Sequence, residues 1–418
     1  MQMLINCYIY IWISLFYQAI FSCAQPQQFD QVPASPHLAA IDSIMAHYID
    51  ARLIPGGVVL VKHQGQVIHE AAYGFARVKN FDDAWIDHPP ATHTTTRYDL
   101  ASLTKVVGTT SSIMLLHDQG KLSVDDPVYR YLPAFDSPEK RTITLRHLLT
   151  HTAGLIEWYP LFYQCDNRQD TYRLIESLPL KYPVGAGRHY SDLGFWLLGE
   201  IVEKVSGEPL EDFVRSHLFI PLAMEHTGFL PDTTWPIAAT SLGNPYEYRM
   251  VRDTSLGFTV PGLDPDSWNG WRQYVLVGEV NDGNAWYAGR GVCGAAGLFS
   301  TVEDIQKLLD MLMHNGMVAG QPFISPGTLK TFFTPDKFHN GLGWMMDPSN
   351  AFMRDAPAGS FGHTGFTGTS ICVVPEQDLD IIILINRQNV GLQPNGSYFN
   401  PNPIREGIFK AVMESTKG

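Results

Sequence analysis

The sequence has few positive charges and few cysteines. Its 29 Lys and Arg residues are outnumbered by 42 Asp and Glu residues, so the formal net charge at pH 7 is −13. A nucleic-acid partner would require a basic face, and this charge balance argues against one. Five irregularly spaced cysteines are too few for a disulfide framework. The sequence also contains no long run of like charge, no low-complexity tract and no internal repeat, which argues against a repeat architecture.

Long apolar runs are also scarce, and the one that stands out is at the N-terminus. The chain is apolar through Phe21 and polar from Gln25. This length is typical of a secretory signal, and Ser22 and Ala24 fit its small-residue cleavage site, so residues 1–24 are predicted to be a signal peptide. No later segment has about 18 consecutive apolar residues, the length that a membrane-spanning helix needs. We therefore expect an exported protein, either periplasmic or secreted.

Two other interpretations of the N-terminus stay open. The letters IFSC resemble a lipoprotein signal in which Cys23 carries lipid, and this would tether the protein to a membrane. An uncleaved membrane anchor is the third interpretation, since no Lys or Arg precedes the apolar run. Removal of residues 1–24 leaves three cysteines, of which at least one must be unpaired: Cys165, Cys293 and Cys372.

Hydrophobic periodicity predicts strands near both ends of the chain and helices between them. Hairpins are expected at 58–73, with a turn at Gln64-Gly65, and at 363–387, with a turn at 375–378. The Pro- and Gly-rich segment 231–282 is expected to be mostly loop. Helices are expected at 35–53, 103–120, 205–221 and 402–415.

This order of elements favours an α+β fold. One antiparallel sheet would be built from both chain ends and flanked by helices, with a mostly helical lobe inserted between its strands. A chain of 418 residues with 45% hydrophobic content can bury a large core. Residues 36–415 are therefore predicted to form a single domain of two lobes.

Ser102 and Lys105 lie three residues apart at the start of an apolar helical segment. Residues three apart share one face of a helix, so the hydroxyl and the amine can meet. A serine hydroxyl needs a base beside it, and a lysine can be that base if its pKa is lowered. The S-x-x-K spacing alone is weak evidence, because about one match is expected by chance in a chain of this length. A second match, from Ser137 to Lys140, contains a proline and is expected to lie in a surface loop.

Tyr190 stands two residues before Asp192, just ahead of another apolar helical segment. A tyrosine held near cations can ionise and act as a base. The alternative is a packed tyrosine beside an aspartate that caps the helix. Similar short patterns occur at Tyr48, which we assign to the core, and at Tyr398, which we assign to the surface.

The triplet His-Thr-Gly occurs twice. The copy at His363 leads into an apolar strand, and a strand edge can admit a substrate backbone and offer an N–H group to an oxyanion. The copy at His226 runs into Pro231, so no strand is expected after it. The copy at His363 therefore has the setting that catalysis requires.

Taken together and in this order, the three motifs resemble those of the serine β-lactamase and penicillin-binding protein superfamily. That superfamily has S-x-x-K, then Y-x-N or S-x-N, then K-T-G or H-T-G. The resemblance is closest to class C β-lactamase-like serine hydrolases and extends over roughly residues 36–415. Further stretches support it, at 143–155, 190–210, 220–232 and 291–305.

The resemblance implies three catalytic residues. Ser102 matches the nucleophile that forms the acyl-enzyme, and Lys105 matches the lysine that takes its proton or tunes the site. Tyr190 matches the class C tyrosine that takes part in acid–base chemistry. The resemblance leaves open which of Lys105 and Tyr190 is the base.

The resemblance also implies a set of substrate-binding residues. His363, Thr364 and Gly365 match the strand triad on the side of the substrate carboxylate. The backbone N–H groups of Ser102 and Phe366 would form the oxyanion hole. Asp192 stands where the family usually has Asn, and its charge would raise the pKa of Lys105 and Tyr190.

Other departures concern the substrate. His363 replaces the Lys of true β-lactamases, which weakens the fixed positive charge that faces a substrate carboxylate. We therefore do not expect potent hydrolysis of β-lactam antibiotics. The segment 278–299 resembles one in D-alanyl-D-alanine carboxypeptidase-like and muramyl-peptide amidase-like members. Those often have His where this chain has Asn281 and Ala295. His151 matches a family hallmark, and we interpret it as structural.

We therefore expect a serine hydrolase that transfers acyl groups without a metal or an organic cofactor. The expected substrate is a small molecule or a peptidoglycan-derived compound, foremost a cell-wall peptide or muropeptide cleaved by a carboxypeptidase or amidase. A carboxylesterase of the same fold, or a non-catalytic sensor that recognises penicillin, are the alternatives. The sequence leaves the oligomeric state open.

Overall fold

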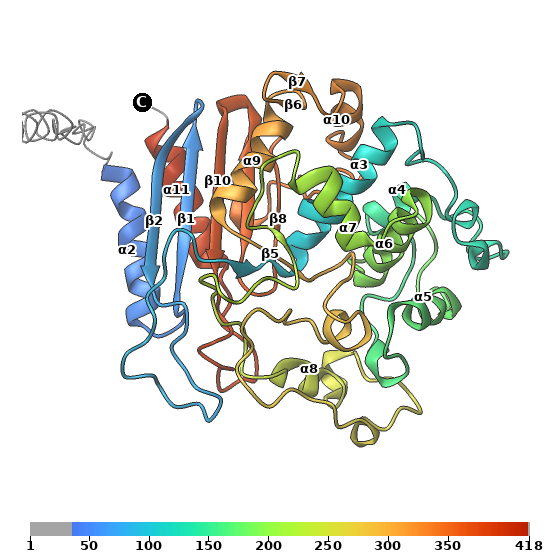
Figure 1. The fold of residues 1–418 in the computed structure, drawn as a ribbon, viewed down its shortest axis with the longest axis horizontal. Coiled ribbons are helices and arrows are strands. Elements are labelled where there is room, and N and C mark those ends of the chain that lie inside the picture. The colour runs from blue at the N-terminus through green and yellow to red at the C-terminus, as the bar shows by residue number, and fades with distance from the viewer. Residues whose placement is uncertain (1–35, 417–418) are drawn as a thin grey trace, which may run out of the picture.

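A five-stranded antiparallel sheet runs through the molecule in the order β2–β1–β10–β9–β8 (Figure 1). In this computed structural model residues 36–416 are described, so the predicted signal at 1–24 lies outside the described residues. The strands are β1 (Gly56–His63), β2 (Gln66–Gly74), β8 (Phe361–Thr364), β9 (Ser370–Val374) and β10 (Leu379–Ile385). Because β1 pairs with β10, the two ends of the chain share one sheet, as predicted.

Both hairpins have their turns where the sequence placed them. Between β1 and β2, Gln64 and Gly65 have φ values of 49° and 73°, the left-handed pair typical of a two-residue hairpin turn. Between β9 and β10, residues 375–377 form a short 3₁₀ turn, and Asp378 follows with a φ of 47°. The strand β8 precedes this second hairpin and forms an edge of the sheet.

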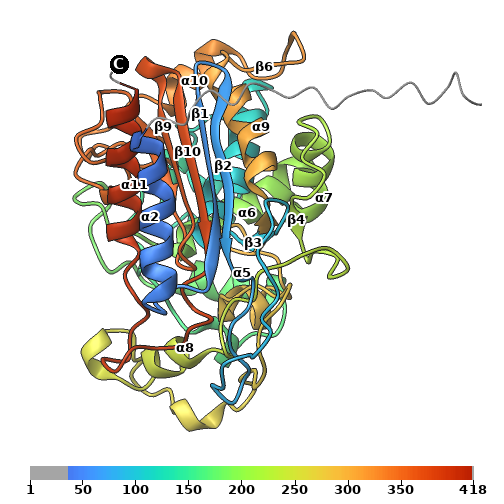
Figure 2. The same ribbon diagram turned by 90° about the vertical axis from the view of Figure 1, so that its left-hand side faces the viewer.

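Helices cover both faces of the sheet. The terminal helices α2 (Pro36–Asp50) and α11 (Asn402–Ser415) lie side by side on one face, and helices from the middle of the chain lie on the other (Figure 2). Successive residues of a strand point to opposite faces. Val59 therefore joins the core beneath α2 and α11, whereas Val58 joins the larger core on the other side. Two covered faces explain why β10 is apolar at almost every position.

The middle of the chain supplies the remaining elements. Its α-helices are α3 (Ser111–Asp118), α4 (Leu145–Leu149), α5 (Arg168–Ser177), α6 (Asp192–Ser206), α7 (Leu210–Val214), α8 (Pro245–Met250), α9 (Val302–Met313) and α10 (Pro326–Phe332). Its strands are β3 (Tyr98–Asp99), β4 (Gly228–Phe229) and β5 (Leu298–Ser300) in one small sheet, and β6 (Met317–Val318) and β7 (Gln321–Pro322) in another. The division of residues 36–415 into two lobes stays a prediction.

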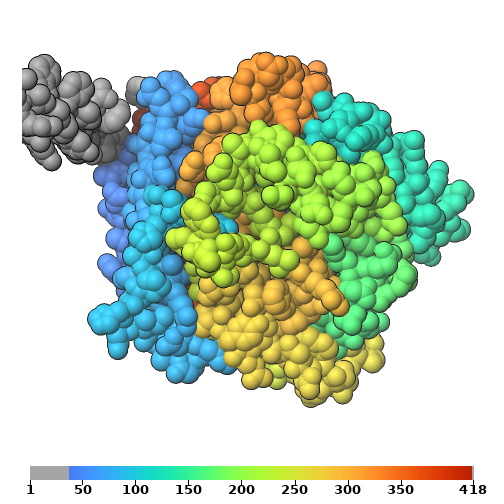
Figure 3. Space-filling view, in the orientation of Figure 1, coloured from blue at the N-terminus to red at the C-terminus, as the bar shows by residue number. Residues whose placement is uncertain are grey.

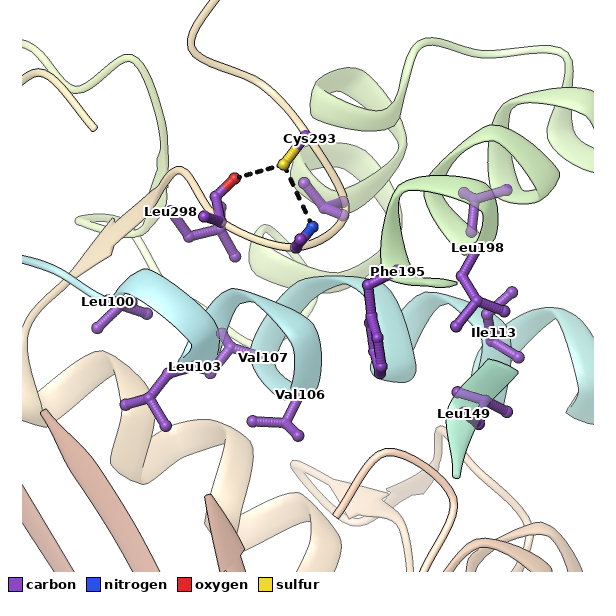
Figure 4. Packing of buried hydrophobic residues seen from close by; sticks show 14 of the residues in the cluster. Leu100, Leu103, Val106, Val107, Ile113, Leu149, Phe195, Leu198, Cys293 and Leu298 are labelled. Atoms are coloured by element: carbon purple, nitrogen blue, oxygen red, sulfur yellow. Dashed lines mark hydrogen bonds between the residues drawn. The ribbon is translucent and has the colours of Figure 1, made fainter. Parts of the chain in front are cut away.

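The segment that carries Ser102 is more irregular than the single helix that was predicted. It begins as a 3₁₀ turn at Ala101–Leu103, continues as a π-helix over Lys105–Thr110 and ends as α3. Apolar side chains hold it from several sides (Figure 4). π-helical turns often occur at functional sites, because the widened turn re-aims side chains.

Some local predictions were wrong. The helix expected over 205–221 is interrupted, because Gly207 adopts a left-handed φ of 78° and ends α6 before α7 begins. A short strand, β4, does follow His226. Tyr398 was assigned to the surface but is only 6% exposed. Lys140 is 7% exposed, since its amine turns inward to the carbonyl of Glu176 on α5.

The segment predicted to be loop is mostly irregular, as expected, apart from α8 and two short 3₁₀ turns. On the face shown in Figure 3 its yellow residues gather at the bottom, between the blue N-terminal strands and the green middle of the chain. Residues from this segment form one wall of the candidate site described next.

Candidate active site

Ser102 and Lys105 meet as the spacing predicted. The Lys105 ammonium donates a hydrogen bond of 2.9 Å to Ser102 Oγ and another of 3.0 Å to the carbonyl of Ala295. Lys105 is completely buried. Ser102 lies just after the end of β3, where two cavities meet, and it lines both of them.

Asp192 is the charge partner of Lys105. Its Oδ1 lies 2.7 Å from Lys105 Nζ, at the first residue of α6. Burial lowers the pKa of Lys105, but the charges of Asp192 and Tyr190 and their hydrogen bonds outweigh it, so the net pKa is raised. Lys105 is therefore an ammonium in the resting site, as the aspartate at position 192 led us to expect.

Tyr190 packs against Lys105. Its ring lies 5.1 Å from Lys105 Nζ, and its hydroxyl interacts with both Ser102 and Lys105. Burial raises the pKa of Tyr190, the Lys105 charge lowers it, and the Asp192 carboxylate raises it again. The net pKa is raised, so the resting phenol is protonated.

His151 holds Tyr190 in place. The two rings lie 4.3 Å apart, and His151 Nδ1 accepts a hydrogen bond from the backbone of Ser191. Burial and the nearby charge of Arg188 lower the pKa of His151 well below its usual value, so the ring is neutral. These contacts agree with the structural role predicted for His151.

His363 lies on the edge strand β8 and faces the same site. Its ring is 1% exposed and lies 6.1 Å from that of Tyr190, and its Nδ1 donates to the carbonyl of Thr364. Burial and the Lys105 charge lower the pKa of His363 to about 3. A neutral ring at this position supplies no fixed positive charge.

Two arginines that the sequence analysis did not identify supply positive charge near His363. Arg387 and Arg405 line a cavity of about 350 Å³ together with Ser102, His363 and Thr364, and we call it the basic cavity. Burial lowers the pKa of Arg387 to about 10 and that of Arg405 to about 9, so both are cations at neutral pH. This cavity suits a carboxylate.

Arg405 also shapes the loop after β8. One of its terminal nitrogens donates to the carbonyls of Gly365, Gly368 and Thr369, at 3.3, 3.0 and 2.8 Å. At Gly365 a Cβ atom would lie 2.1 Å from Thr369 Oγ1 and 2.5 Å from the carbonyl oxygen of Leu100. Gly365 therefore lets this loop approach the strand that leads to Ser102.

The second cavity, of about 290 Å³, lies on the other side of Ser102. Its aromatic walls come from Trp158, Tyr246, Phe258 and Phe366. Carboxyl groups dominate its ionisable lining, where Lys105, paired with Asp192, is the one cation among the described residues. We call it the acidic cavity after Glu157, Asp192, Glu247 and Asp282.

Glu247 and Asp282 titrate near neutral pH. Burial raises the pKa of Glu247 to about 8, with the Asp282 charge adding to it. Burial and the Asp192 charge raise the pKa of Asp282 to about 6. Each accepts a backbone N–H, from Gly283 and from Ala285 respectively. This cavity disfavours an anionic group, and more so as the pH rises.

The predicted site residues thus come together, whereas the control motifs do not. Ser102, Lys105, Tyr190 and Asp192 line the acidic cavity; Ser102, Tyr190 and the stretch from His363 to Phe366 line the basic one. Lys140 is directed at α5 instead, and His226 packs against Trp235. Sequence reasoning missed the two arginines, Glu247 and Asp282. Arg405 lies on α11 and Glu247 on α8, whereas Arg387 and Asp282 lie in irregular segments. Their only signal in the sequence is charge, which by itself indicates a solvated surface.

The comparisons with known proteins agree with this arrangement. The family described as Beta-lactamase matches residues 41–395. The chain belongs to the β-lactamase family, whose members include serine hydrolases. The resemblance to the serine β-lactamase superfamily that the motifs indicated is thereby confirmed.

Two relatives of this β-lactamase-family protein are named as an amidase and as a carboxypeptidase. It is 31% identical to "N-acetylmuramyl-L-alanine amidase" of Bacillus subtilis, over 90% of this chain and 87% of that one. It is 33% identical to "Putative D-alanyl-D-alanine carboxypeptidase" of Escherichia coli, over 84% and 82%. The crystal structure of a class C β-lactamase from Rhodobacter sphaeroides shares its fold, with a TM-score of 0.62 and 20% identity over 90% and 99% of the two chains.

The Asp192–Lys105 pair leads to a prediction about pH dependence. Asp192→Asn removes the carboxylate charge that raises the pKa of Lys105. The burial of Lys105, which lowers this pKa, then has a larger net effect. The pKa of Lys105 and of Tyr190 should therefore fall, by about one unit or more for so close a charge. The acidic limb of the profile of kcat/KM against pH should move to lower pH by that amount. An unmoved limb would show that Asp192 is not coupled to the base.

Proposed function

We propose that this protein is an exported serine hydrolase that cleaves cell-wall peptides through an acyl-enzyme, in the manner of a carboxypeptidase. Two cavities of opposite charge that meet at Ser102 carry the proposal. The basic cavity would hold the carboxylate of a leaving amino acid, and the acidic cavity would hold the acyl side of the peptide. The printed names of the two relatives support a peptidoglycan-derived substrate.

In the proposed reaction Ser102 Oγ attacks the scissile carbonyl, and its proton passes to Lys105 or Tyr190. The backbone N–H groups of Ser102 and Phe366 donate to the oxyanion that forms. The oxyanion then collapses, the C–N bond breaks, and the leaving amine takes up the proton. Water then attacks the resulting ester, and the same base takes a proton from it. The ester C–O bond breaks, that proton passes to Ser102 Oγ, and the acid is the second product.

The raised pKa of Lys105 bears on the first step. A protonated Lys105 stabilises negative charge on Ser102 Oγ but cannot accept its proton. A substrate that fills the acidic cavity brings apolar surface against Asp192 and displaces water, which alters the balance of charges around the lysine. The Asp192→Asn profile described above tests whether this charge balance sets the base.

A panel of substrates tests the proposal. Muropeptides with a free C-terminal carboxylate should be shortened by one amino acid, which mass spectrometry detects. Matched peptides with an amidated C-terminus should react more slowly, because they place no charge beside Arg387 and Arg405. Simple esters and a chromogenic cephalosporin complete the panel. Faster cleavage of esters than of any peptide would favour the carboxylesterase; no turnover of any compound would favour the penicillin-recognising sensor.

Export and membrane attachment belong to the same proposal. A substrate in the cell wall requires a periplasmic or extracellular enzyme, and residues 1–24 or a lipidated Cys23 would provide the route. Within residues 36–416, no helix has the length and apolar character to cross the bilayer. Mass determination of the mature N-terminus would distinguish cleavage after Ala24 from lipidation of Cys23.

The acidic cavity leads to a prediction about substrate charge. Because burial and neighbouring carboxylate charges raise the pKa values of Glu247 and Asp282, this pair ionises in the neutral range, and the cavity becomes more negative as the pH rises through it. An acyl group with a lysine-type ammonium, which stays charged there, should gain about tenfold in kcat/KM over a matched neutral acyl group between pH 6 and pH 9.

Glu247→Gln should flatten the upper part of this rise, since the amide cannot ionise. Glu139→Gln, on an exposed turn, is the matched control and should leave the rise intact. Selectivity that does not change with pH in the native protein, or an equal rise in Glu247→Gln, would contradict this role for the cavity.

A further inference from the structure

Asp99 is a buried carboxylate that lies three residues before Ser102. It is 2% exposed, and both of its oxygens accept backbone hydrogen bonds. Oδ1 accepts from the N–H of Ala101 at 2.8 Å, and Oδ2 accepts from the N–H of Asn281 at 2.7 Å. One side chain therefore connects the turn before the candidate nucleophile with a segment some 180 residues away that lines the acidic cavity.

The hydrogen bond from the Ala101 N–H to Asp99 stabilises an unfavourable backbone conformation at Ala101. Ala101 has a φ of 45°, in the left-handed region that residues with a Cβ avoid. It immediately precedes Ser102 and begins the 3₁₀ turn that aims Ser102 Oγ at Lys105. Strained residues of this kind persist only where their surroundings determine them, and they cluster at active sites.

The second bond anchors a polar network behind the acidic cavity. The Asn281 side chain donates to Ser241 Oγ at 2.5 Å and accepts from Gln388 at 2.9 Å. Arg272 donates to the Asn281 carbonyl at 3.0 Å. These partners lie in segments far apart in the sequence, so the network fixes the position of Asn281 relative to the sheet.

A third contact reaches the loop after β8. Thr367 Oγ1 donates to the carbonyl of Asp99 at 2.8 Å, and Thr369 Oγ1 donates to that of Leu100 at 3.1 Å. The two residues that precede Ala101 and Ser102 are thereby connected to the loop that carries Phe366. The two N–H groups assigned to the oxyanion hole thus belong to segments that Asp99 and its neighbours join.

We propose that Asp99 is a positioning residue: its carboxylate holds the left-handed turn at Ala101 against the Asn281 segment, so that Ser102 faces Lys105 and both cavities. The inference rests on the proposed role of Ser102 as nucleophile. It adds a residue that touches neither the substrate nor the reacting atoms and acts through Ala101. Asp282 and Arg272 are the nearby charged groups that bear on Asp99.

The test measures how fast a fluorophosphonate probe labels Ser102. In Asp99→Asn one oxygen that accepts an N–H is replaced by an amide nitrogen that cannot, so the turn loses a bond. We expect the maximal labelling rate to fall about 10²-fold, the effect of a displacement of about 1 Å. The probe concentration at half-maximal rate should change little, and so should the melting temperature.

Asp380→Asn is the matched control. Asp380 is also 2% exposed and accepts a side-chain hydrogen bond from Gln306, but it lies on β10 near the turn after β9, away from Ser102. The labelling rate of Asp380→Asn should match that of the native protein. An equal loss in both variants would show that any buried carboxylate has this effect, and it would overturn the inference.

A second substitution tests the route through Ala101. Glycine adopts the left-handed backbone without the steric cost of a Cβ, so Asp99→Asn combined with Ala101→Gly should recover about fivefold of the lost rate. Ala101→Gly alone should have a small effect.

Three further outcomes would overturn the inference. One is a folded Asp99→Asn that is labelled at the native rate, and another is a loss that Ala101→Gly does not restore. The third applies if Asp99→Asn is insoluble. An insoluble Asp99→Asn/Ala101→Gly double variant would then overturn the inference, whereas a soluble double variant that the probe labels would support it. Labelling that survives in Ser102→Ala would instead refute the proposed function.

Discussion

Ser102→Ala is expected to abolish hydrolysis, with a loss of about 10⁴-fold or more on every substrate, since it removes the proposed nucleophile. Covalent labelling by a fluorophosphonate or a fluorescent penicillin should vanish with it. Ser102 Oγ lies 2.9 Å from the Lys105 ammonium and at the junction of both cavities. The substitution removes one partly exposed oxygen only, so the protein should keep its melting temperature.

Ser137→Ala is the internal control for this experiment. Ser137 begins the second S-x-x-K match, whose Lys140 is directed at a carbonyl of α5 rather than at a cavity. This variant should hydrolyse substrate and take up the probe as the native protein does. Equal activity of the two variants would show that Ser102 is not the nucleophile, and an unlabelled native protein would favour the non-catalytic sensor.

Lys105→Ala is expected to lower kcat/KM by about 10²-fold or more, the usual range for an acid–base group. Its ammonium contacts Ser102 Oγ, Asp192 and the Ala295 carbonyl. Removing it takes away both the proton acceptor, if Lys105 is that group, and the charge that stabilises the attacking oxygen. Rates with muropeptide and with the probe should fall together.

Lys140→Ala separates catalysis from the general effect of deleting a buried lysine. Lys105 and Lys140 are 0% and 7% exposed, and both donate to a backbone carbonyl. Both variants should lose stability, because each leaves a cavity and an unpaired carbonyl. Only Lys105→Ala should lose turnover in the folded protein. A native rate in that variant would remove Lys105 from the mechanism.

The fold was predictable where apolar residues recur with a regular period. The hairpin at β1 and β2 and the terminal helices α2 and α11 were found because strands repeat every two residues and helices about every 3.6. Where one residue interrupts a periodic stretch, the prediction failed: Gly207 ends α6 within the helix expected over 205–221. The π-helix after Ser102 was missed because its apolar spacing is hard to distinguish from that of an α-helix.

The candidate site was predictable only in part. Ser102, Lys105, Tyr190 and the stretch at His363 belong to short motifs whose order resembles a known superfamily, and the folded chain brings them together. Tyr398 was assigned to the surface from its polar neighbours, yet its ring lies 6.0 Å from that of Phe366 at the wall of the site. Local composition cannot reveal which loops fold back over a cavity.

By itself, the sequence determined the class of the protein: a sheet made from both chain ends, a serine with its lysine, and the tyrosine and strand triplet that accompany them. The serine–lysine contact follows from spacing along one helical segment, which local backbone geometry translates directly into a contact. The sheet follows from hydrophobic periodicity, and the other motifs from the order in which they resemble a known superfamily. Only the tertiary structure decided the charge around that centre. Arg387 and Arg405 on one side and Glu247 and Asp282 on the other come from remote segments, as does Asn281, which binds Asp99. Packing alone sets the distances between them.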